Sequence, residues 1–324
     1  MYIKLYSKDA VVRTMTAMQR TGRFAHTYIL TGDKGFGKKT SALYIAMSLL
    51  CDNGNACGEC RQCHRILSGQ HPDVIIPEKD KRSKIYTVDL IREKVVADAI
   101  ISPNDCDRKV YILPDCEGWK DASQDALLKV TEEPPPSVYF IFTARNKGIF
   151  LPTLISRAMC IEIPEADRES CRECLADLGK YSDEQIKQAV NAFGGNIGGC
   201  IGYLDGDEEL THMARSTERA ALDIAGRNEY DMLAVLTEFS SDRENLRQLL
   251  GMIIKIVRDG LAMQVKGDTD LLGCSEKAAN ALTNSLSAER LTAIYEELCR
   301  VSEMCTMNVN AAVAAAMLAG ICCS

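Results

Sequence analysis

A short glycine-rich segment near the N-terminus contains residues that could bind phosphate. An apolar run, residues 28–31, leads into GDKGFGKKT, in which Gly32, Gly37 and Lys38 match the first part of a phosphate-binding loop. Glycines let successive backbone N–H groups turn inward, the following helix adds the positive end of its dipole, and the lysine supplies a cation. A glycine-rich turn with a charged tip is the simpler alternative. The order of strand, loop and helix favours a nucleotide site, whose candidate residues are Gly32, Gly35, Gly37, Lys38, Lys39 and Thr40.

The residue after the loop lysine departs from a working nucleotide site. Phosphate-binding loops place Ser or Thr there as a ligand to Mg²⁺, whereas this chain has Lys39, and its hydroxyl comes one residue later at Thr40. Each residue of an α-helix turns the side chain by about 100°, so Thr40 is a poor replacement. We expect ATP or ADP to bind weakly or not at all, and we do not expect Mg²⁺ in the site.

A second acidic position has also changed. In ATPases of this kind, the strand that we expect at residues 110–113 ends in an aspartate that holds the metal ion, usually followed by a catalytic glutamate. Here Pro114 comes first and Asp115 second. Proline has neither a carboxylate nor an amide hydrogen, so we interpret Asp115 as a polar residue that ends the strand rather than as a catalytic group. Together with Lys39, this change predicts negligible ATP hydrolysis by the chain alone.

Four closely spaced cysteines form a second candidate site. They follow the pattern C-x5-C-x2-C-x2-C, and their thiolates can converge on one tetrahedral centre that has no position for water. That arrangement is typical of structural zinc. A redox dithiol, an iron–sulfur cluster and four unrelated core cysteines are the alternatives, although a redox pair needs only two cysteines. We predict bound Zn²⁺, with His64 as a solvated neighbour, and the expected ligands are Cys51, Cys57, Cys60 and Cys63.

Composition limits the class of protein. The chain has 324 residues, 46% of them hydrophobic, which is enough for two or three packed domains. It has no apolar run of about 18 residues and its N-terminal sequence lacks the pattern of an export signal. We therefore expect a cytoplasmic protein with no membrane partner, whose 15 cysteines are largely reduced. The net charge of -7 argues against a protein that binds DNA by itself.

Apolar runs and helical periodicity predict the organisation of the chain. Residues 1–165 alternate short β-branched runs with amphipathic stretches, which is typical of a parallel sheet covered by helices. After Pro164 the strand patterns give way to helical ones. We predict an α/β P-loop domain over residues 1–165, a small helical domain over 166–208 and an all-helical region over 209–324. The expected strands are residues 28–31, 74–76, 110–113, 138–142 and 160–163.

Capping residues predict several helix ends. Gly22 should end the first helix, and a capping box formed by Ser182 and Gln185 should begin a helix that stops at Gly194. The alanine-rich segment 311–319 predicts a helix that packs closely against others. The apolar faces of the C-terminal helices fit either an oligomerisation domain or a bundle buried within one chain.

Several longer motifs, in their order along the chain, resemble one family. They are AHTYILTGDKGFGKKT, then SGQHPDV after the cysteines, then SQDALLKVTEEPPPSVYFIFT, and finally LPTLISR. Over roughly its first 200 residues, the chain closely resembles the AAA+ subunits of the bacterial DNA polymerase III clamp loader, most specifically the delta-prime family. The resemblance implies an AAA+ domain with a zinc knuckle, a helical lid, and an all-α collar domain that holds the subunits of a pentameric ring together.

The same resemblance gives roles to Ser156 and Arg157. From its residue type alone, an arginine just before a strand is usually a solvated surface residue. In the family, the equivalent pair reaches into the ATP site of a neighbouring subunit, where an arginine finger neutralises charge on the transferred phosphate. The family usually has cysteine at the next position, which is Ala158 here. We expect that change to be tolerated, because Ala158 is not the charged group.

The resemblance also implies partners. These are clamp-loader motor subunits and a delta subunit in a hetero-pentameric ring, with the sliding clamp and primed DNA reached through the complex. We predict a non-catalytic subunit that donates Arg157 during clamp loading in DNA replication. The alternatives are a motor ATPase of the gamma/tau type and a zinc-containing nucleic-acid-binding regulator of replication. The acidic net charge and the lack of a recognisable recognition helix argue against the regulator.

Overall fold

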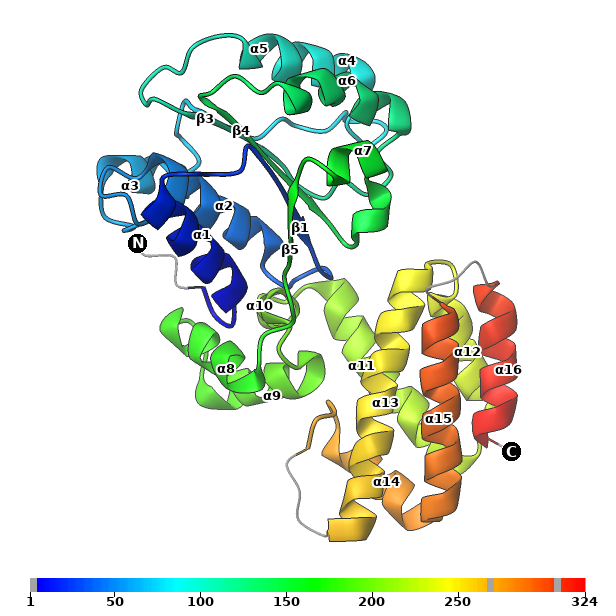
Figure 1. Ribbon diagram of the computed structural model, residues 1–324. Coiled ribbons are helices and arrows are strands. Elements are labelled where there is room, and N and C mark those ends of the chain that lie inside the picture. Colours follow the sequence, from blue (N-terminus) through cyan, green and yellow to red (C-terminus); the bar gives the residue numbers. More distant parts are fainter. Residues whose placement is uncertain (1–4, 267–270, 306–309, 324) are drawn as a thin grey trace. The chain divides into compact units, whose positions relative to one another are not determined.

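The protein has a sheet-containing unit followed by a helical unit. The computed structural model describes residues 5–266, 271–305 and 310–323, and the chain divides into two compact units, Met1–Ala166 and Asp167–Ser324. The first unit contains a sheet covered by helices, and within the described residues the second unit contains helices alone (Figure 1). The predicted α/β domain followed by an all-helical region is therefore confirmed. The boundary at residue 208 within the helical part stays a prediction.

The sheet of the first unit has five parallel strands in the order β2-β3-β4-β1-β5. Each expected strand is present, with its ends shifted by one or two residues. The shortest strand lies at one edge of the sheet and leaves Ile76 outside it, with 39% of that side chain exposed. The strands are β1 (Thr27–Thr31), β2 (Val74–Ile75), β3 (Lys109–Leu113), β4 (Val138–Ala144) and β5 (Met159–Glu162).

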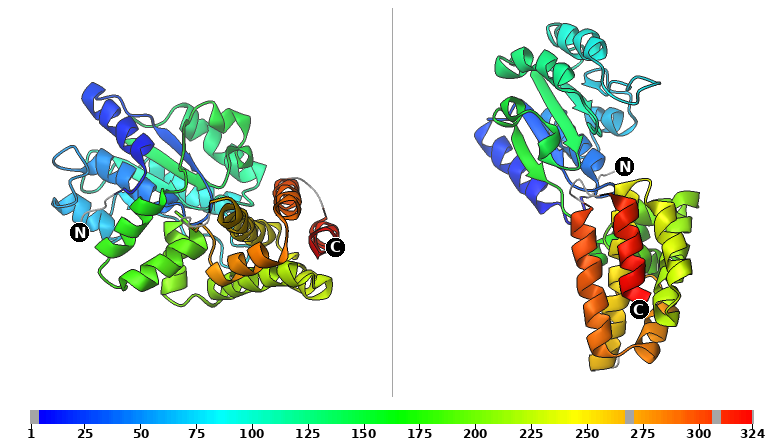
Figure 2. Two further views of the ribbon diagram at one scale, coloured as in Figure 1. Left: turned by 90° about the horizontal axis from the view of Figure 1, so that it is seen from below. Right: turned by 90° about the vertical axis from the view of Figure 1, so that its right-hand side faces the viewer.

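Helices cover both faces of this sheet, which explains why its strands are apolar throughout. Alternate residues of a strand point to opposite faces, so Tyr28 and Leu30 lie in one hydrophobic core while Ile29 lies in the other. The first face is covered by α1 (Asp9–Thr21), α2 (Lys38–Leu50) and α3 (Arg61–Leu67). Figure 2 shows these layers from two further sides. The second face is covered by α4 (Val88–Ile91), the π-helical turn η1 (Arg92–Val96), α5 (Ala97–Ala99), α6 (Asp121–Glu132) and α7 (Pro152–Ile155).

The helix ends predicted from capping residues are confirmed. Gly22 ends α1 in the left-handed conformation, with φ 66°. In the second unit, the Ser182 side chain accepts a hydrogen bond from the backbone of Gln185, whose own side chain bonds back to Ser182. The helix that begins there ends at Gly194.

The helical unit has one hydrophobic core that includes residues from all of its helices. The longest helix, α13, contacts α11, α14 and α15, and α12 packs along α16. The predicted alanine-rich helix is therefore present and packed, although its outer side exposes Val313 and Met317. The helices are α8 (Arg168–Asp177), α9 (Asp183–Phe193), α10 (Ile197–Leu204), α11 (Glu208–Gly226), α12 (Glu229–Phe239), α13 (Arg243–Lys266), α14 (Glu276–Ser285), α15 (Ala288–Met304) and α16 (Ala311–Cys323).

In the described part of the chain, no helix combines the length and the apolar character that crossing a bilayer needs.

Candidate functional site

The glycine loop leaves the end of β1 and passes close to β5. Gly32 has φ 148°, and a Cβ at this position would lie 2.3 Å from the carbonyl oxygen of Ile163. Its N–H also donates to the carbonyl groups of Ala144 and Arg145, at 3.2 and 3.0 Å, at the end of β4. Only glycine fits this close approach. The start of the loop is therefore fixed by the strands on both sides of β1.

Lys38, the lysine of the loop, turns back onto the loop itself. Its side chain is buried, and Nζ donates hydrogen bonds to the carbonyl oxygens of Gly32 at 2.6 Å and Asp33 at 2.9 Å. Burial lowers the pKa of Lys38, and the negative charges of Glu117, Asp115 and Asp33 partly offset that effect. The cation that would meet an outer phosphate is thus held by backbone oxygens of the loop.

The two residues after Lys38 do not restore a metal site. Both Lys39 and Thr40 lie in the first turn of α2 and are exposed. The residue directly after Lys38 presents an ammonium group, which cannot act as an oxygen ligand. Gly35 and Gly37 both adopt φ 86°, which suits a turn of the loop but contributes no side chain.

The loop after β3 contains Asp115 and also brings in two charged residues, Glu117 and Arg145, that the sequence motifs did not point to. Asp115 has φ 51°, an uncommon value for a residue with a side chain, and its N–H donates to the Thr143 hydroxyl at 2.9 Å. Two residues later, the Glu117 carboxylate accepts the backbone N–H of Arg145 at 2.7 Å. Glu117 and Arg145 are therefore additional charged groups near Lys38.

One sequence signal could have identified Glu117 and Arg145. Glu117 follows β3 and Arg145 follows β4. In the sheet, β3 is next to β4 and β4 is next to β1, so the carboxyl ends of these three parallel strands lie along one edge. Ligand sites in parallel sheets collect at this edge. Charged residues within a few positions of several strand ends are thus candidates for one shared site.

The four predicted zinc ligands come together at the end of α2. Their Sγ atoms, from Cys51, Cys57, Cys60 and Cys63, all lie within 4.8 Å of one another. The Cys51 Sγ lies 3.6 Å from that of Cys57 and 3.9 Å from that of Cys60. In a tetrahedral site with Zn–S bonds of about 2.3 Å, the sulfurs are about 3.8 Å apart. The cluster could therefore hold a metal ion.

Backbone N–H groups point at three of the four sulfurs, and the pKa falls for Cys57, whereas burial raises the pKa of Cys60 and Cys63. The N–H groups of Cys57, Cys60 and Cys63 donate to the sulfurs of Cys51, Cys57 and Cys60 at 3.5, 3.3 and 3.4 Å respectively. The backbone N–H groups of Glu59 and Cys60 lower the pKa of Cys57 to about 6. Hydrogen bonds of this kind stabilise thiolates, the form in which cysteine binds metals. His64 is exposed, as predicted, and is not among the clustered ligands.

A buried polar network fastens α3 to the loop before β3. The His71 ring lies 3.0 Å from the Gln62 side-chain oxygen, and its Nδ1 accepts the N–H of Asp73 at 3.1 Å. Asp73 is fully buried, and its carboxylate accepts backbone N–H bonds from residues 104–106 at 2.6 to 2.9 Å. Burial opposes ionisation, but these bonds outweigh it and hold the pKa of Asp73 below its ordinary value. The HPD part of the SGQHPDV motif is therefore structural.

Ser156 and Arg157 lie at the end of α7. The Arg157 guanidinium donates through Nη1 to the carbonyl oxygen of Thr153 at 2.7 Å and to the hydroxyl of Ser156 at 3.3 Å, while Nη2 pairs with Glu132 at the end of α6. About a third of the side chain, 34%, remains exposed. Within the described contacts, the partners of Arg157 come from α6 and α7 and not from the glycine loop. Arg157 is thus positioned separately from the nucleotide-loop residues.

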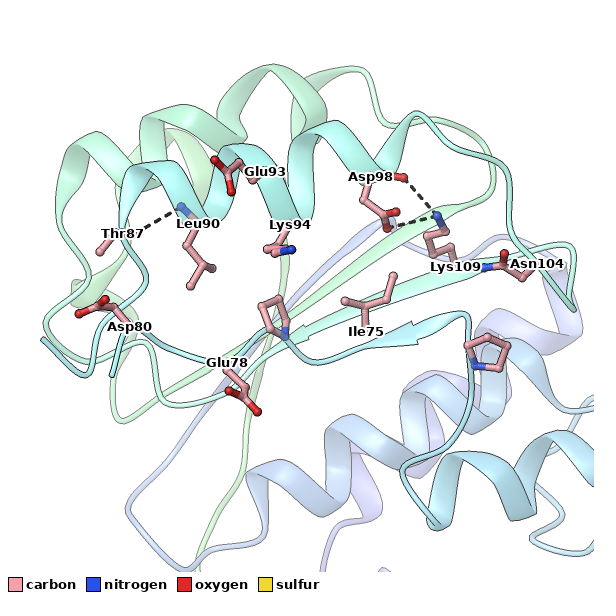
Figure 3. Close-up of a pocket in the computed structure, with 12 residues that line it drawn as sticks. Ile75, Glu78, Asp80, Thr87, Leu90, Glu93, Lys94, Asp98, Asn104 and Lys109 are labelled. Atoms are coloured by element: carbon pink, nitrogen blue, oxygen red, sulfur yellow. Dashed lines mark hydrogen bonds and ion pairs between the residues drawn. The ribbon is translucent and has the colours of Figure 1, made fainter. Parts of the chain in front are cut away.

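The first unit also contains a cavity of about 780 Å³ beside the edge strand β2. Figure 3 shows Leu90, Glu93 and Lys94 of the α4–η1 helix above it and Ile75 of β2 below it. At one end, the buried Lys109 ammonium pairs with Asp98 at 3.2 Å. None of the residues predicted to bind nucleotide or metal lines this cavity.

Two solved structures that align with most of this chain do so at low TM-scores. A DNA clamp loader delta protein from Bacillus subtilis aligns with 96% of this chain and 99% of its own, with a TM-score of 0.36 and 15% sequence identity. A RuvB protein from Thermotoga maritima aligns over 91% and 87%, with a TM-score of 0.40 and 16% identity.

Sequence comparison gives the family. The family model described as "DNA polymerase III, delta subunit" matches residues 7–167. The DNA polymerase III subunit delta' of Pseudomonas aeruginosa is 32% identical over 176 residues, which are 53% of each chain. The delta' subunit of Yersinia pestis is 33% identical over 261 residues, or 77% of this chain and 75% of that one. That of Escherichia coli is 27% identical over 304 residues, or 89% and 85%. These matches, with the sheet and loop described above, assign the chain to the delta-prime family of DNA polymerase III subunits.

Proposed function

We propose that this chain is a non-catalytic subunit of the DNA polymerase III clamp loader that supplies Arg157 to the ATP site of a neighbouring subunit. The observation that carries the proposal is the contrast between two cations of the first unit. Lys38 is buried and bound to backbone oxygens of the loop, whereas the Arg157 side chain is 34% exposed. A group that acts on a neighbour must be accessible from outside its own chain.

The chain's own loop lacks what hydrolysis requires. Phosphoryl transfer depends on metal ions and fixed charges around the phosphate. Lys39 and Pro114 occupy the two positions where a motor ATPase would have its metal ligands. We therefore propose that ATP or ADP binds weakly or not at all and that Mg²⁺ is not held here.

Arg157 has the chemistry that a neighbouring ATP site would need. A guanidinium is planar, remains charged at all physiological pH values and can bind two phosphate oxygens at once. Near the transferred phosphate it would offset the negative charge that develops on the oxygens. Ser156 contributes its hydroxyl to the same arginine and so belongs to the positioning of this group.

We also propose that the four-cysteine cluster holds structural zinc. The sulfur separations and the backbone N–H bonds to sulfur support this assignment. Four thiolates would leave no open position for water, so zinc would stabilise the turn between α2 and α3 rather than take part in a reaction.

The proposed partners follow from the proposed role. They are gamma/tau-type motor subunits and a delta subunit in a cytoplasmic hetero-pentameric ring, with the sliding clamp and primed DNA reached through that ring. The outer side of α16 supports an assembly role for the C-terminal helices, since Val313 and Met317 are 55% and 49% exposed. In this proposal the helical unit serves as a lid, residues 166–208, followed by a collar.

The proposal is tested by reconstituting the complex with the cognate motor and delta subunits, the clamp and primed DNA. At the one ATP site that Arg157 serves, we expect Arg157→Ala to reduce DNA-stimulated hydrolysis by about 10³-fold or more, because arginine fingers contribute on that scale. Gel filtration should show the complex still assembled. Arg20→Ala, which removes an exposed guanidinium from α1, is the control and should leave hydrolysis intact. Unchanged hydrolysis with Arg157→Ala would reject the proposal.

A further inference from the structure

We propose that Glu132 is a positioning residue for Arg157, an inference that rests on the proposed function. Glu132 is the last residue of α6, and Arg157 follows α7, 25 residues further along the chain. Their side chains form an ion pair and a hydrogen bond between Glu132 Oε1 and Arg157 Nη2. The pair joins the ends of two helices that contact each other.

The contacts of the guanidinium leave room for a phosphate. Arginine has five N–H donors in a fixed plane. Among the residues that the structure describes, this guanidinium makes three donor contacts, to Glu132, to the Thr153 carbonyl and to the Ser156 hydroxyl. Within that part of the chain two donors are left over, which is the number that a bidentate contact to phosphate uses. The contacts within the chain therefore restrain the guanidinium without using all of its donors.

The position of Glu132 is unusual for a carboxylate on a helix. A negative charge in the last turn is disfavoured by the helix dipole, because the carbonyl groups there are already negative. Arg157 offsets the charge of this carboxylate, since its guanidinium pairs with Glu132 at the end of α6 and also donates to the carbonyl of Thr153 in α7.

The exposure of the pair indicates an effect on geometry rather than on folding. The side chains of Arg157 and Glu132 are 34% and 48% exposed, and exposed ion pairs contribute little to stability. Fixing a long side chain in one orientation beforehand, however, removes the entropy cost of ordering that side chain during the reaction step. We infer that Glu132 acts on the rate at which a neighbour hydrolyses ATP and not on the fold.

The next residue offers a matched control. Glu133 is also exposed and carries the same charge, but within the described hydrogen bonds and ion pairs its side chain has no contact with Arg157. Substituting either glutamate by alanine changes the net charge equally. Only Glu132→Ala removes a restraint on the guanidinium.

The experiment measures ATP saturation curves for the full complex with primed DNA. We expect Glu132→Ala to lower kcat about threefold to tenfold with little change in KM. This loss is smaller than the roughly hundredfold loss of rate that a 1 Å misplacement can cause. The reason is that the Thr153 carbonyl still holds Nη1 of Arg157. Glu132→Gln should lose less, since its amide oxygen can still accept the hydrogen bond. Glu133→Ala should match the unmodified protein. Thermal unfolding of each variant chain should be nearly unchanged.

A double variant separates positioning from a general structural effect. If Glu132 acts through Arg157, adding Glu132→Ala to Arg157→Ala should change the rate by no more than about twofold. A further loss in the double variant would overturn the inference, as would a rise in kcat for Glu132→Ala or an effect equal to that of Glu133→Ala. If Arg157→Ala itself has no effect, the proposed function fails as well. If only the Glu132 variants lack an effect, the proposed function stands and this inference falls.

Discussion

Two positively charged side chains of the first unit could each serve ATP chemistry, and their surroundings are opposite. Lys38 is buried at the start of α2, and its ammonium is bound by two carbonyl oxygens of the glycine loop. Arg157 lies after α7 and is partly exposed, and its contacts among the described residues use only some of its donors. The proposed function needs this difference, because a group that acts on a neighbour must be accessible from outside its own chain.

If the proposed function holds, the same comparison explains how a P-loop fold can be kept without its reaction. Gly32 lies against the ends of β4 and β5 through its backbone, and the Lys38 side chain ties α2 to the carbonyl groups of the loop. The metal ligands, in contrast, contribute to the reaction and little to the fold. Replacement by Lys39 and Pro114 is therefore compatible with an intact sheet.

The largest effect on stability is expected from removing the zinc that we propose for the cysteine cluster. Structural zinc contributes about 10–16 kcal/mol of apparent binding free energy in isolated zinc-finger peptides, so its removal should cost this larger unit several kcal/mol. Cys63→Ala or a strong chelator should lower the melting temperature of the isolated chain, and elemental analysis should find zinc bound before treatment. The exposed Cys160 lies outside the cluster, and Cys160→Ala is the control.

Removing zinc also tests whether the glycine loop can be disturbed without disturbing the surroundings of Arg157. The knuckle follows α2, the helix that begins at Lys38, so its loss should disturb the loop side of the sheet first. Iron with visible absorbance in the purified protein would contradict the zinc assignment.

A smaller loss is expected from Gly32→Ala. The added Cβ would lie 2.3 Å from the Ile163 carbonyl oxygen at a φ of 148°, so backbone must move. We expect a cost of about 3 kcal/mol in the free energy of unfolding, measured by denaturant titration. Gly22→Ala is a matched control, because Gly22 also has a positive φ, 66°, but a Cβ there meets nothing within 4 Å. Equal costs for both variants would show that the close approach to β5 is unimportant.

Much of the fold could be predicted because local sequence determines it. Strands buried on both faces gave continuous apolar runs such as residues 138–142, and the capping box at Ser182 marked a helix start that the structure contains. The strand ends were less certain, as Ile76 shows, because pairing with a neighbouring strand decides where an edge strand stops.

The side-chain contacts of the site could not be predicted, because they join residues that are distant in sequence. Glu132 and Arg157 are 25 residues apart, and Glu117 and Arg145 are 28 apart. Their meeting depends on strand order and on how α6 and α7 pack. The inward turn of Lys38 likewise depends on its side-chain rotamer, which the sequence does not fix. The cysteines, in contrast, are close enough in sequence that their spacing predicted the cluster directly.

The most direct test of the whole account substitutes each cation in turn within one reconstituted clamp loader. Lys38→Ala should leave DNA-stimulated ATP hydrolysis within about twofold of the unmodified complex, since Lys38 serves only its own loop. Arg157→Ala should lose about 10³-fold or more of the hydrolysis at the one ATP site that it serves. The reverse pattern, with hydrolysis lost in Lys38→Ala and retained in Arg157→Ala, would contradict the account.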